Sequence, residues 1–172
     1  PPRLLSSAAS DVYKRQYQLL IWIFEFMNRI LQFTISYLGL LPYTYLLSDL
    51  YLFKLIDPNI IINMIIFNTI IIYTFIGAIH WQWLQKDGST IYTIHGFIPS
   101  LVSFFIMIMA LLEFEKGYLL SSLVIFLLIQ LMLDFLCYLN DKLDHKVIYF
   151  LRIPITTSLC VILIIPVLFT NY

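Results

Sequence analysis

The sequence predicts an all-α integral membrane protein, a bundle of five transmembrane helices. The chain of 172 residues is 61% hydrophobic and only 12% charged, whereas soluble domains are roughly 45 to 50% apolar and about 25% charged. Its apolar runs are long enough to cross a hydrocarbon core of roughly 30 Å, which needs about 20 helical residues. Because backbone groups in lipid must be satisfied within a segment, continuous runs of this length form helices.

Five apolar runs follow one another along the chain, at 30–47, 60–83, 91–112, 118–139 and 147–169. The segments between them are short and contain residues that end or start helices, such as Asp57, Pro58 and Asn59 before the second run. None of these connections is long enough for a soluble domain. We therefore expect residues 27–172 to form a single five-helix transmembrane domain.

The N-terminal residues have a different origin in our interpretation. Residues 6–16 read SSAASDVYKRQ, which matches the translation of a sequencing-library transposase adapter, so we interpret residues 1–16 as a non-native scar. Residues 17–26 are then read-through of upstream sequence, and Met27 is the native start. The alternative is a genuine N-terminal helix that Glu25 interrupts.

Basic residues near the ends of the runs predict the orientation. The N-terminal side carries five of them, Arg29, Lys86, Lys142, Lys146 and Arg152, and the opposite side carries two, Lys54 and Lys116. The positive-inside rule then places the N-terminus in the cytoplasm or in the matrix of an organelle, and the C-terminus on the opposite side. Four aromatic residues at the same inner boundary are predicted interface anchors: Trp81, Trp83, Tyr138 and Tyr149.

Four runs each bring an ionisable residue to one depth. His80, His95, Asp134 and Arg152 lie a few residues from the inner ends of their runs, roughly 5 to 8 Å inside the boundary at a rise of 1.5 Å per residue. Ionisable groups inside a membrane are costly unless paired or wet, so they indicate candidate sites. The predicted polar intramembrane cluster is His80, His95, Gln130, Asp134 and Arg152.

Helical spacing predicts which faces turn towards the bundle interior. The four predicted inward faces are Thr69, Tyr73, Gly77 and His80; His95, Pro99 and Ser103; Ser122, Gln130, Asp134 and Cys137; and Arg152, Thr156 and Cys160. Small residues allow close approach of helix backbones, and the predicted helix-packing glycines are Gly39, Gly77 and Gly96.

Each candidate has a structural interpretation beside the functional one. Asp134 and Arg152 form a buried ion pair that fixes packing, or belong to a functional site. His80 braces a neighbouring helix, or binds a ligand. Because the spacing matches no metal-ligand pattern, nucleophile elbow or phosphate-binding loop, we expect no metal, no cofactor and no enzymatic activity.

Four segments together resemble a known family. They are GLLPY at 39–43, FIGAIHW at 75–81, Gln130 with Asp134, and YFLRIPIT at 149–156. These segments resemble the transmembrane protein 69 family, a domain of unknown function found in bacteria and mitochondria. The resemblance implies a multi-pass fold in a bacterial or mitochondrial inner membrane and no established activity. Gln82 departs from the family pattern, which has glycine after the tryptophan.

Two functional hypotheses remain from the sequence. The leading one is a non-enzymatic factor that binds a partner or lipid and serves assembly or stability. Its partners are the lipid bilayer and another membrane protein complex or a second copy of the chain, and the zero net charge gives no case for nucleic acid. The alternative is a small transporter or proton-coupled carrier that uses the polar cluster, with an intramembrane enzyme as a third hypothesis.

Overall fold

The computed structural model describes residues 17–18, 27, 30–78, 90–140 and 143–169. Within these ranges the chain is helical almost throughout and contains no strand. Five helices are long and apolar enough to cross a membrane: Ile30–Phe53, Pro58–Ala78, Ile94–Leu111, Lys116–Leu139 and His145–Phe169. The predicted all-α bundle of five transmembrane helices is therefore confirmed.

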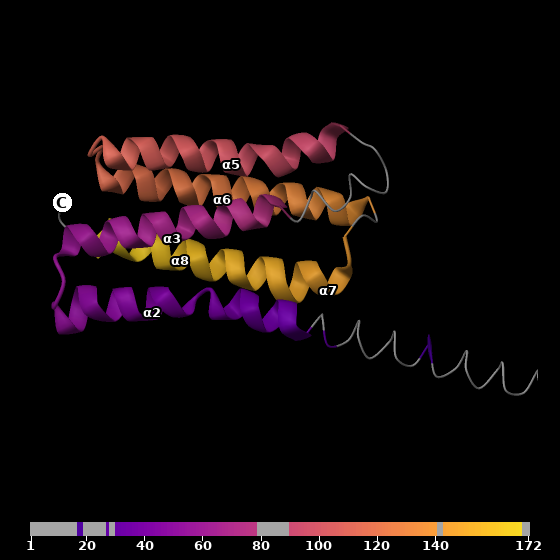
Figure 1. Cartoon of the computed structure of the whole chain (residues 1–172), viewed down its shortest axis with the longest axis horizontal. Helices are drawn as coiled ribbons and strands as arrows, with labels where there is room; N and C mark the ends of the chain where they lie inside the picture. The colour runs from indigo at the N-terminus through magenta and orange to yellow at the C-terminus, as the bar shows by residue number, and fades with distance from the viewer. Residues whose placement is uncertain (1–16, 19–26, 28–29, 79–89, 141–142, 170–172) are drawn as a thin grey trace, which may run out of the picture. The chain divides into compact units, whose positions relative to one another are not determined.

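The chain divides into two compact units, Pro1–Leu38 and Gly39–Tyr172. In the first unit residues 30–38 are helical, and the Ser36 hydroxyl donates to the Gln32 carbonyl oxygen at 2.7 Å. Figure 1 labels the elements of the second unit, which are α2 (Leu41–Ser48), η1 (Asp49–Phe53), α3 (Pro58–Ala78), α5 (Thr90–Leu111), α6 (Lys116–Leu139), α7 (His145–Val147), η2 (Ile148–Arg152) and α8 (Ile153–Phe169).

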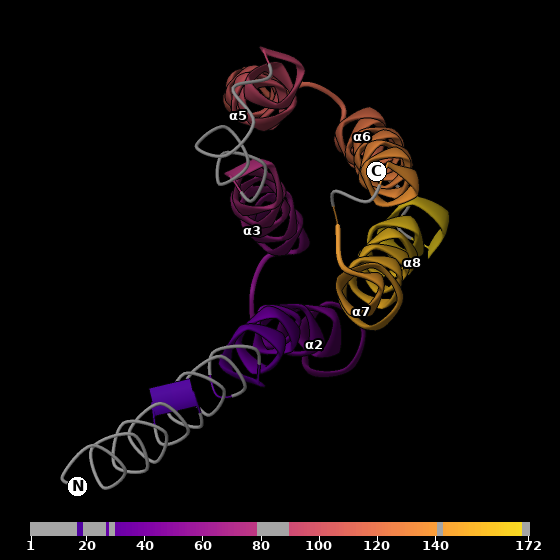
Figure 2. The same cartoon turned by 90° about the vertical axis from the view of Figure 1, so that its right-hand side faces the viewer.

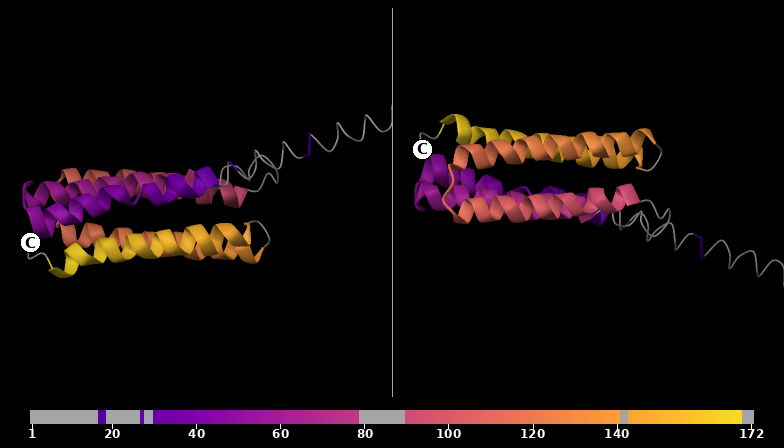
Figure 3. Two further views of the ribbon diagram at one scale, coloured as in Figure 1. Left: turned by 90° about the horizontal axis from the view of Figure 1, so that it is seen from below. Right: turned by 90° about the horizontal axis from the view of Figure 1, so that it is seen from above.

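Helix α3 is central to the second unit. It packs mainly against α5 and also contacts α2, α6 and α8, whereas α6 packs mainly against α8. Viewed end-on, α2, α3 and α5 follow one another on one side, with α6 and α8 on the other (Figure 2). The two views of Figure 3 show the same division into two layers of roughly parallel helix axes.

The sequence of α3 explains its central position. Its buried residues recur at helical spacing, and most of them are isoleucines: Ile61, Ile62, Ile65, Ile66, Thr69, Ile70, Tyr73, Ile76 and Gly77. This apolar stripe packs against the neighbouring helices, because helical residues three and four apart share a face. The faces predicted from spacing are buried as expected at Thr69, Tyr73, Gly77, Pro99, Ser103, Gln130, Asp134, Cys137, Arg152, Thr156 and Cys160.

The first membrane span continues beyond the predicted end at residue 47. The span extends through the π-helical segment η1 to Phe53. Asp49 can lie inside the bundle, with no exposed surface, because backbone amides donate hydrogen bonds to its carboxylate. Asp49 accepts hydrogen bonds from the amides of Leu55 at 3.3 Å and Ile56 at 3.0 Å. Lys54 then ends the helix in the left-handed conformation, with φ of 53°.

A second π-helical segment, η2, precedes Pro154 in the last span. The Ile153 amide donates to the carbonyl oxygen of Ile148, five residues back. Pro154 has no N–H, and in a regular α-helix its ring would clash with the carbonyl of Phe150. The wider turn relieves that clash, and it brings Arg152 into the interior, where the residue is 6% exposed.

Helices α3 and α5 approach each other most closely at a glycine. A Cβ atom on Gly77 would lie 2.7 Å from Pro99 Cγ and 2.9 Å from the carbonyl oxygen of Gly96. One turn earlier on α3, the Thr74 and Ser103 hydroxyl oxygens lie 3.0 Å apart, and the Ser103 hydroxyl also donates to the Ile70 carbonyl oxygen at 3.3 Å. The absence of a side chain at Gly77 therefore permits close packing of α3 against α5. The hydrogen-bonded hydroxyls of Thr74 and Ser103 continue this contact one turn away.

Candidate functional site

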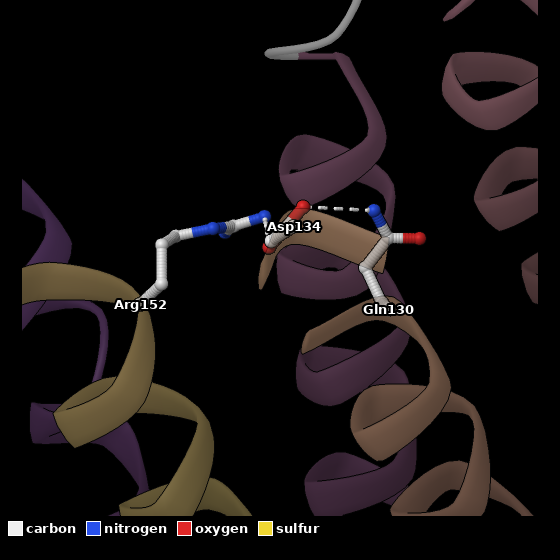
Figure 4. A network of polar contacts seen from close by, with 3 residues as sticks. All are labelled: Gln130, Asp134 and Arg152. Carbon is white, nitrogen blue, oxygen red and sulfur yellow. Dashed lines mark hydrogen bonds and ion pairs between the residues drawn. The ribbon is translucent and has the colours of Figure 1, made fainter. Parts of the chain in front are cut away.

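The candidate site is a buried ion pair between α6 and the segment that leads into α8. The Arg152 guanidinium Nη2 lies 2.5 Å from Asp134 Oδ2. Figure 4 shows the two side chains pointing towards each other from neighbouring helices. Because α6 and α8 follow one another through a short connection, the pair closes a helical hairpin at the end nearest that connection.

Gln130 completes the site from one turn earlier on α6. Its side-chain amide Nε2 donates to Asp134 Oδ1 at 3.3 Å, on the side of the carboxylate away from Arg152 (Figure 4). The carboxylate therefore has a partner for each oxygen. Gln130 and Asp134 are each 2% exposed, so the site lies inside the bundle.

Two further interior residues lie close enough to Asp134 to be affected by its charge. The charge acts electrostatically on Tyr73 of α3 and on Cys137, which lies one turn later on α6. Tyr73 is 2% exposed and contacts the Phe126 ring at a centroid distance of 6.5 Å. The carboxylate thus lies at a position where α3, α6 and the start of α8 come together.

This geometry has a clear energetic consequence. Removing one partner of a buried ion pair leaves an uncompensated charge and typically costs about 3 to 5 kcal/mol, whereas the intact pair contributes little compared with well-packed apolar residues. The cost of separating the two charges therefore favours the arrangement in which α6 and the start of the last span lie side by side. In this site the Arg152 guanidinium compensates the charge of the Asp134 carboxylate, and the Gln130 amide donates a hydrogen bond to it.

The structure brings together only part of the predicted cluster. Gln130, Asp134 and Arg152 meet as described. His95 is partly buried on α5, the helix that packs mainly against α3, one turn before Pro99. His80 lies outside the described residues, so its predicted place in the cluster stays a prediction.

The predicted anchors and packing glycines have different outcomes. Trp81 and Trp83 lie outside the described residues. Gly77 makes the close contact with α5, in which the Gly96 carbonyl takes part, and Gly39 stands in the turn before α2.

The predicted anchors Tyr138 and Tyr149 form an aromatic group with a residue that the sequence analysis did not select, His145. The rings of His145 and Tyr149 have a centroid distance of 4.2 Å, and the two tyrosine rings meet edge-on at 5.9 Å. The Tyr138 hydroxyl and His145 Nδ1 lie 3.1 Å apart. The spacing of four residues between His145 and Tyr149 is a sequence signal that could have identified this contact, because residues four apart on a helix share a face.

Two further interior polar residues were also missed. Asp49 was interpreted as lying beyond the end of the first run, but it is fully buried. Tyr43 forms a hydrogen bond between its hydroxyl and Thr69 Oγ1, at 2.8 Å and within the bundle. The 26 residues between these two partners explain why local spacing could not identify the bond.

The described residues contain no group of three or more histidine, cysteine, aspartate or glutamate side chains placed to hold a metal ion. Family models, curated proteins and solved structures contain no match to this chain. The resemblance to the transmembrane protein 69 family therefore stays a prediction. The fold and the buried ion pair define the class as a multi-pass α-helical membrane protein.

Proposed function

We propose that this protein is a non-enzymatic membrane factor that binds a partner protein or lipid and contributes to assembly or stability. The observation that supports this proposal is the pairing of Asp134 with Arg152. A carboxylate that is already compensated inside the bundle serves helix packing, and the binding role then belongs to the outer helix faces.

Those outer faces are broad and apolar. Exposed aromatic side chains occur on several helices, and those of α5 and the following turn are Phe97, Phe104, Phe105 and Phe114. In a membrane such faces contact either lipid or another protein's helices. The proposal therefore assigns the ionisable residues to the inside of the bundle and recognition to its surface.

The basic residues of the sequence support a proposed orientation, and the resemblance to the transmembrane protein 69 family supports a proposed compartment. We propose a bacterial inner membrane or a mitochondrial inner membrane, with the N-terminus in the cytoplasm or matrix, because five basic residues flank that side against two on the other. Cysteine labelling with a membrane-impermeant maleimide tests this orientation at one position on each side. Lys116→Cys is expected to react from outside and Lys146→Cys only after permeabilisation, and the reverse pattern would overturn it.

Co-purification tests the proposed function directly. The tagged full chain, extracted from its own membrane in a mild detergent, is expected to elute with a larger complex at constant stoichiometry. The matched variant Phe104→Ala, on the exposed face of α5, is expected to weaken that association, with Phe135→Ala on α6 as the control. A chain that elutes only as a free species, without a bound protein or lipid, would count against the proposal.

The carrier alternative requires the ion pair to open. It predicts pH-dependent flux in proteoliposomes that Asp134→Asn abolishes and that Asp144→Asn, an exposed carboxylate beside α7, leaves intact. The proposed function predicts that vesicles with the unaltered protein or with either variant show no more flux than protein-free vesicles. Flux that depends on Asp134 would replace the leading proposal with the carrier.

A further inference from the structure

Helices α5 and α6 enclose an apolar cleft next to the turn that joins them. The cleft has a volume of about 350 Å³, and its lining residues come from both helices and the turn: Val102, Phe105, Ile106, Met109, Phe114, Tyr118, Leu119, Ser122 and Phe126. It lies at the opposite end of α6 from the ion pair, because α6 runs from Lys116 at the turn towards Asp134 near its C-terminal end. The cleft is therefore separate from the candidate site.

The two helices form this cleft because they belong to different layers. Although a turn of only a few residues joins them, α5 packs mainly against α3 and α6 packs mainly against α8. The right-hand view of Figure 3 shows α5 and α6 in separate layers. Their facing side chains consequently leave a space between the two spans.

The residues that line the cleft are almost all apolar and therefore favour a hydrocarbon ligand. Two of the nine lining residues, Tyr118 and Ser122, carry hydroxyl groups, and the Ser122 hydroxyl donates to the Leu119 carbonyl oxygen at 2.8 Å, so its proton is already bonded. Apolar cavities of this kind stay dry, because a water molecule needs several polar partners. A ligand that fills the cleft must therefore be apolar over most of its surface.

The dimensions distinguish an acyl chain from a protein helix. From Tyr118 to Phe126 the cleft extends along α6 for about 12 Å, at 1.5 Å per residue, which is within the half-thickness of a hydrocarbon core of about 30 Å. A helical segment of that length and about 10 Å across has a volume of roughly 900 Å³, far above the volume of the cleft. The length of the cleft therefore fits an acyl chain of a single leaflet.

The position of the cleft indicates which apolar molecule can enter it. Both walls belong to membrane spans, Ile94–Leu111 and Lys116–Leu139, and the side chains of Phe105, Phe114 and Tyr118 at its rim are more than half exposed. The cleft is thus continuous with the surface that the bilayer covers. Phospholipid chains are the apolar molecules that reach this surface at high concentration.

We propose that the α5–α6 cleft is a binding site for one phospholipid, whose acyl chain enters between Val102 and Ser122. This inference rests on the proposed function and specifies the lipid part of it. It assigns to the site an apolar chain and no particular headgroup, and it treats the bound lipid as a component that stays with the protein after extraction.

Native mass spectrometry of the full chain from phosphatidylcholine vesicles tests this site. The unaltered protein is expected to retain one phospholipid, whereas Val102→Trp, which fills the cleft, is expected to retain it at least tenfold less. Val161→Trp is the matched control, because Val161 lies on the exposed face of α8 and outside the cleft, and it is expected to retain the lipid. Ser122→Leu provides a smaller filling change if Val102→Trp does not fold, and circular dichroism checks the helix content of each variant.

Three results would overturn the site: no retained lipid in the unaltered protein, equal retention in Val102→Trp and Val161→Trp, or a protein dimer that Val102→Trp dissociates. The last result would assign the cleft to a second copy of the chain. Loss of the lipid site with continued co-purification of a larger complex would leave the proposed function standing, so the two failures are distinguishable.

Discussion

Gly77 of α3 faces Pro99 of α5 so closely that an added methyl group would lie 2.7 Å from Pro99 Cγ. Both residues are buried. The Gly96 carbonyl oxygen, at 2.9 Å from the same added atom, belongs to the backbone and cannot move aside independently. This contact therefore sets the spacing between the central helix and α5.

Gly77→Ala is expected to lower the free energy of unfolding by about 1 to 3 kcal/mol, the usual cost of overpacking a tight contact. Chemical unfolding in mixed micelles of sodium dodecyl sulfate and a mild detergent measures it. Ala78→Leu, at the exposed neighbouring position, serves as the control and is expected to change stability by less than about 0.5 kcal/mol. Equal stability of Gly77→Ala and the unaltered protein would show that the helices are not held at this distance.

Tyr43 and Thr69 provide a test of polar packing between α2 and α3. Their oxygens are 2.8 Å apart, and the Thr69 hydroxyl also reaches the Ile65 carbonyl oxygen at 2.8 Å. Hydrogen bonds between membrane helices contribute about 0.6 kcal/mol on average and at most about 1.7. Tyr43→Phe is therefore expected to reduce stability by about 0.5 to 1.5 kcal/mol.

The same unfolding assay checks the Tyr43 prediction with a double-mutant cycle. Thr69→Val should make the effect of Tyr43→Phe smaller, because the bond is then already lost. Tyr45→Phe, at a position that is 56% exposed, is the control for loss of a hydroxyl. A Tyr43→Phe effect that is independent of residue 69 would contradict the assigned bond.

Asp49 ends the first span by accepting two backbone amides, so its loss should destabilise the turn that leads into α3. Asp49→Ala leaves the Leu55 and Ile56 amides without this acceptor and is expected to cost about 1 kcal/mol. Hydrogen exchange of these two amides, followed by mass spectrometry, should show faster exchange. Glu115→Ala, whose side chain makes no cap hydrogen bond, should leave exchange at residues 55 and 56 unchanged, and an identical exchange rate in Asp49→Ala would refute the role.

The sequence was sufficient to predict the fold class because continuous apolar runs of about 20 residues have few structural alternatives in lipid. It also predicted that Asp134 and Arg152 could pair, since both lie near the inner ends of consecutive runs. The element bounds were less predictable. The first run was predicted to end at residue 47, before Asp49, yet two amides from the following turn donate to this carboxylate inside the bundle.

The remaining parts depend on contacts between distant residues. Tyr43 and Thr69 lie on different helices, so spacing within one helix does not indicate their hydrogen bond. The π-helical turn at η2 follows from Pro154, whose missing N–H was visible in the sequence. Its effect on the direction of Arg152 required the structure.

The central claim is that Asp134 and Arg152 act as one structural unit, and a double-mutant cycle in the unfolding assay tests it most directly. Asp134→Leu and Arg152→Met are each expected to lower the free energy of unfolding by about 3 to 5 kcal/mol, because each leaves a buried charge without its partner. The double variant is expected to lie within about 2 kcal/mol of the unaltered protein, so the losses are far from additive. Single losses below about 1 kcal/mol that simply add in the double variant would contradict the claim.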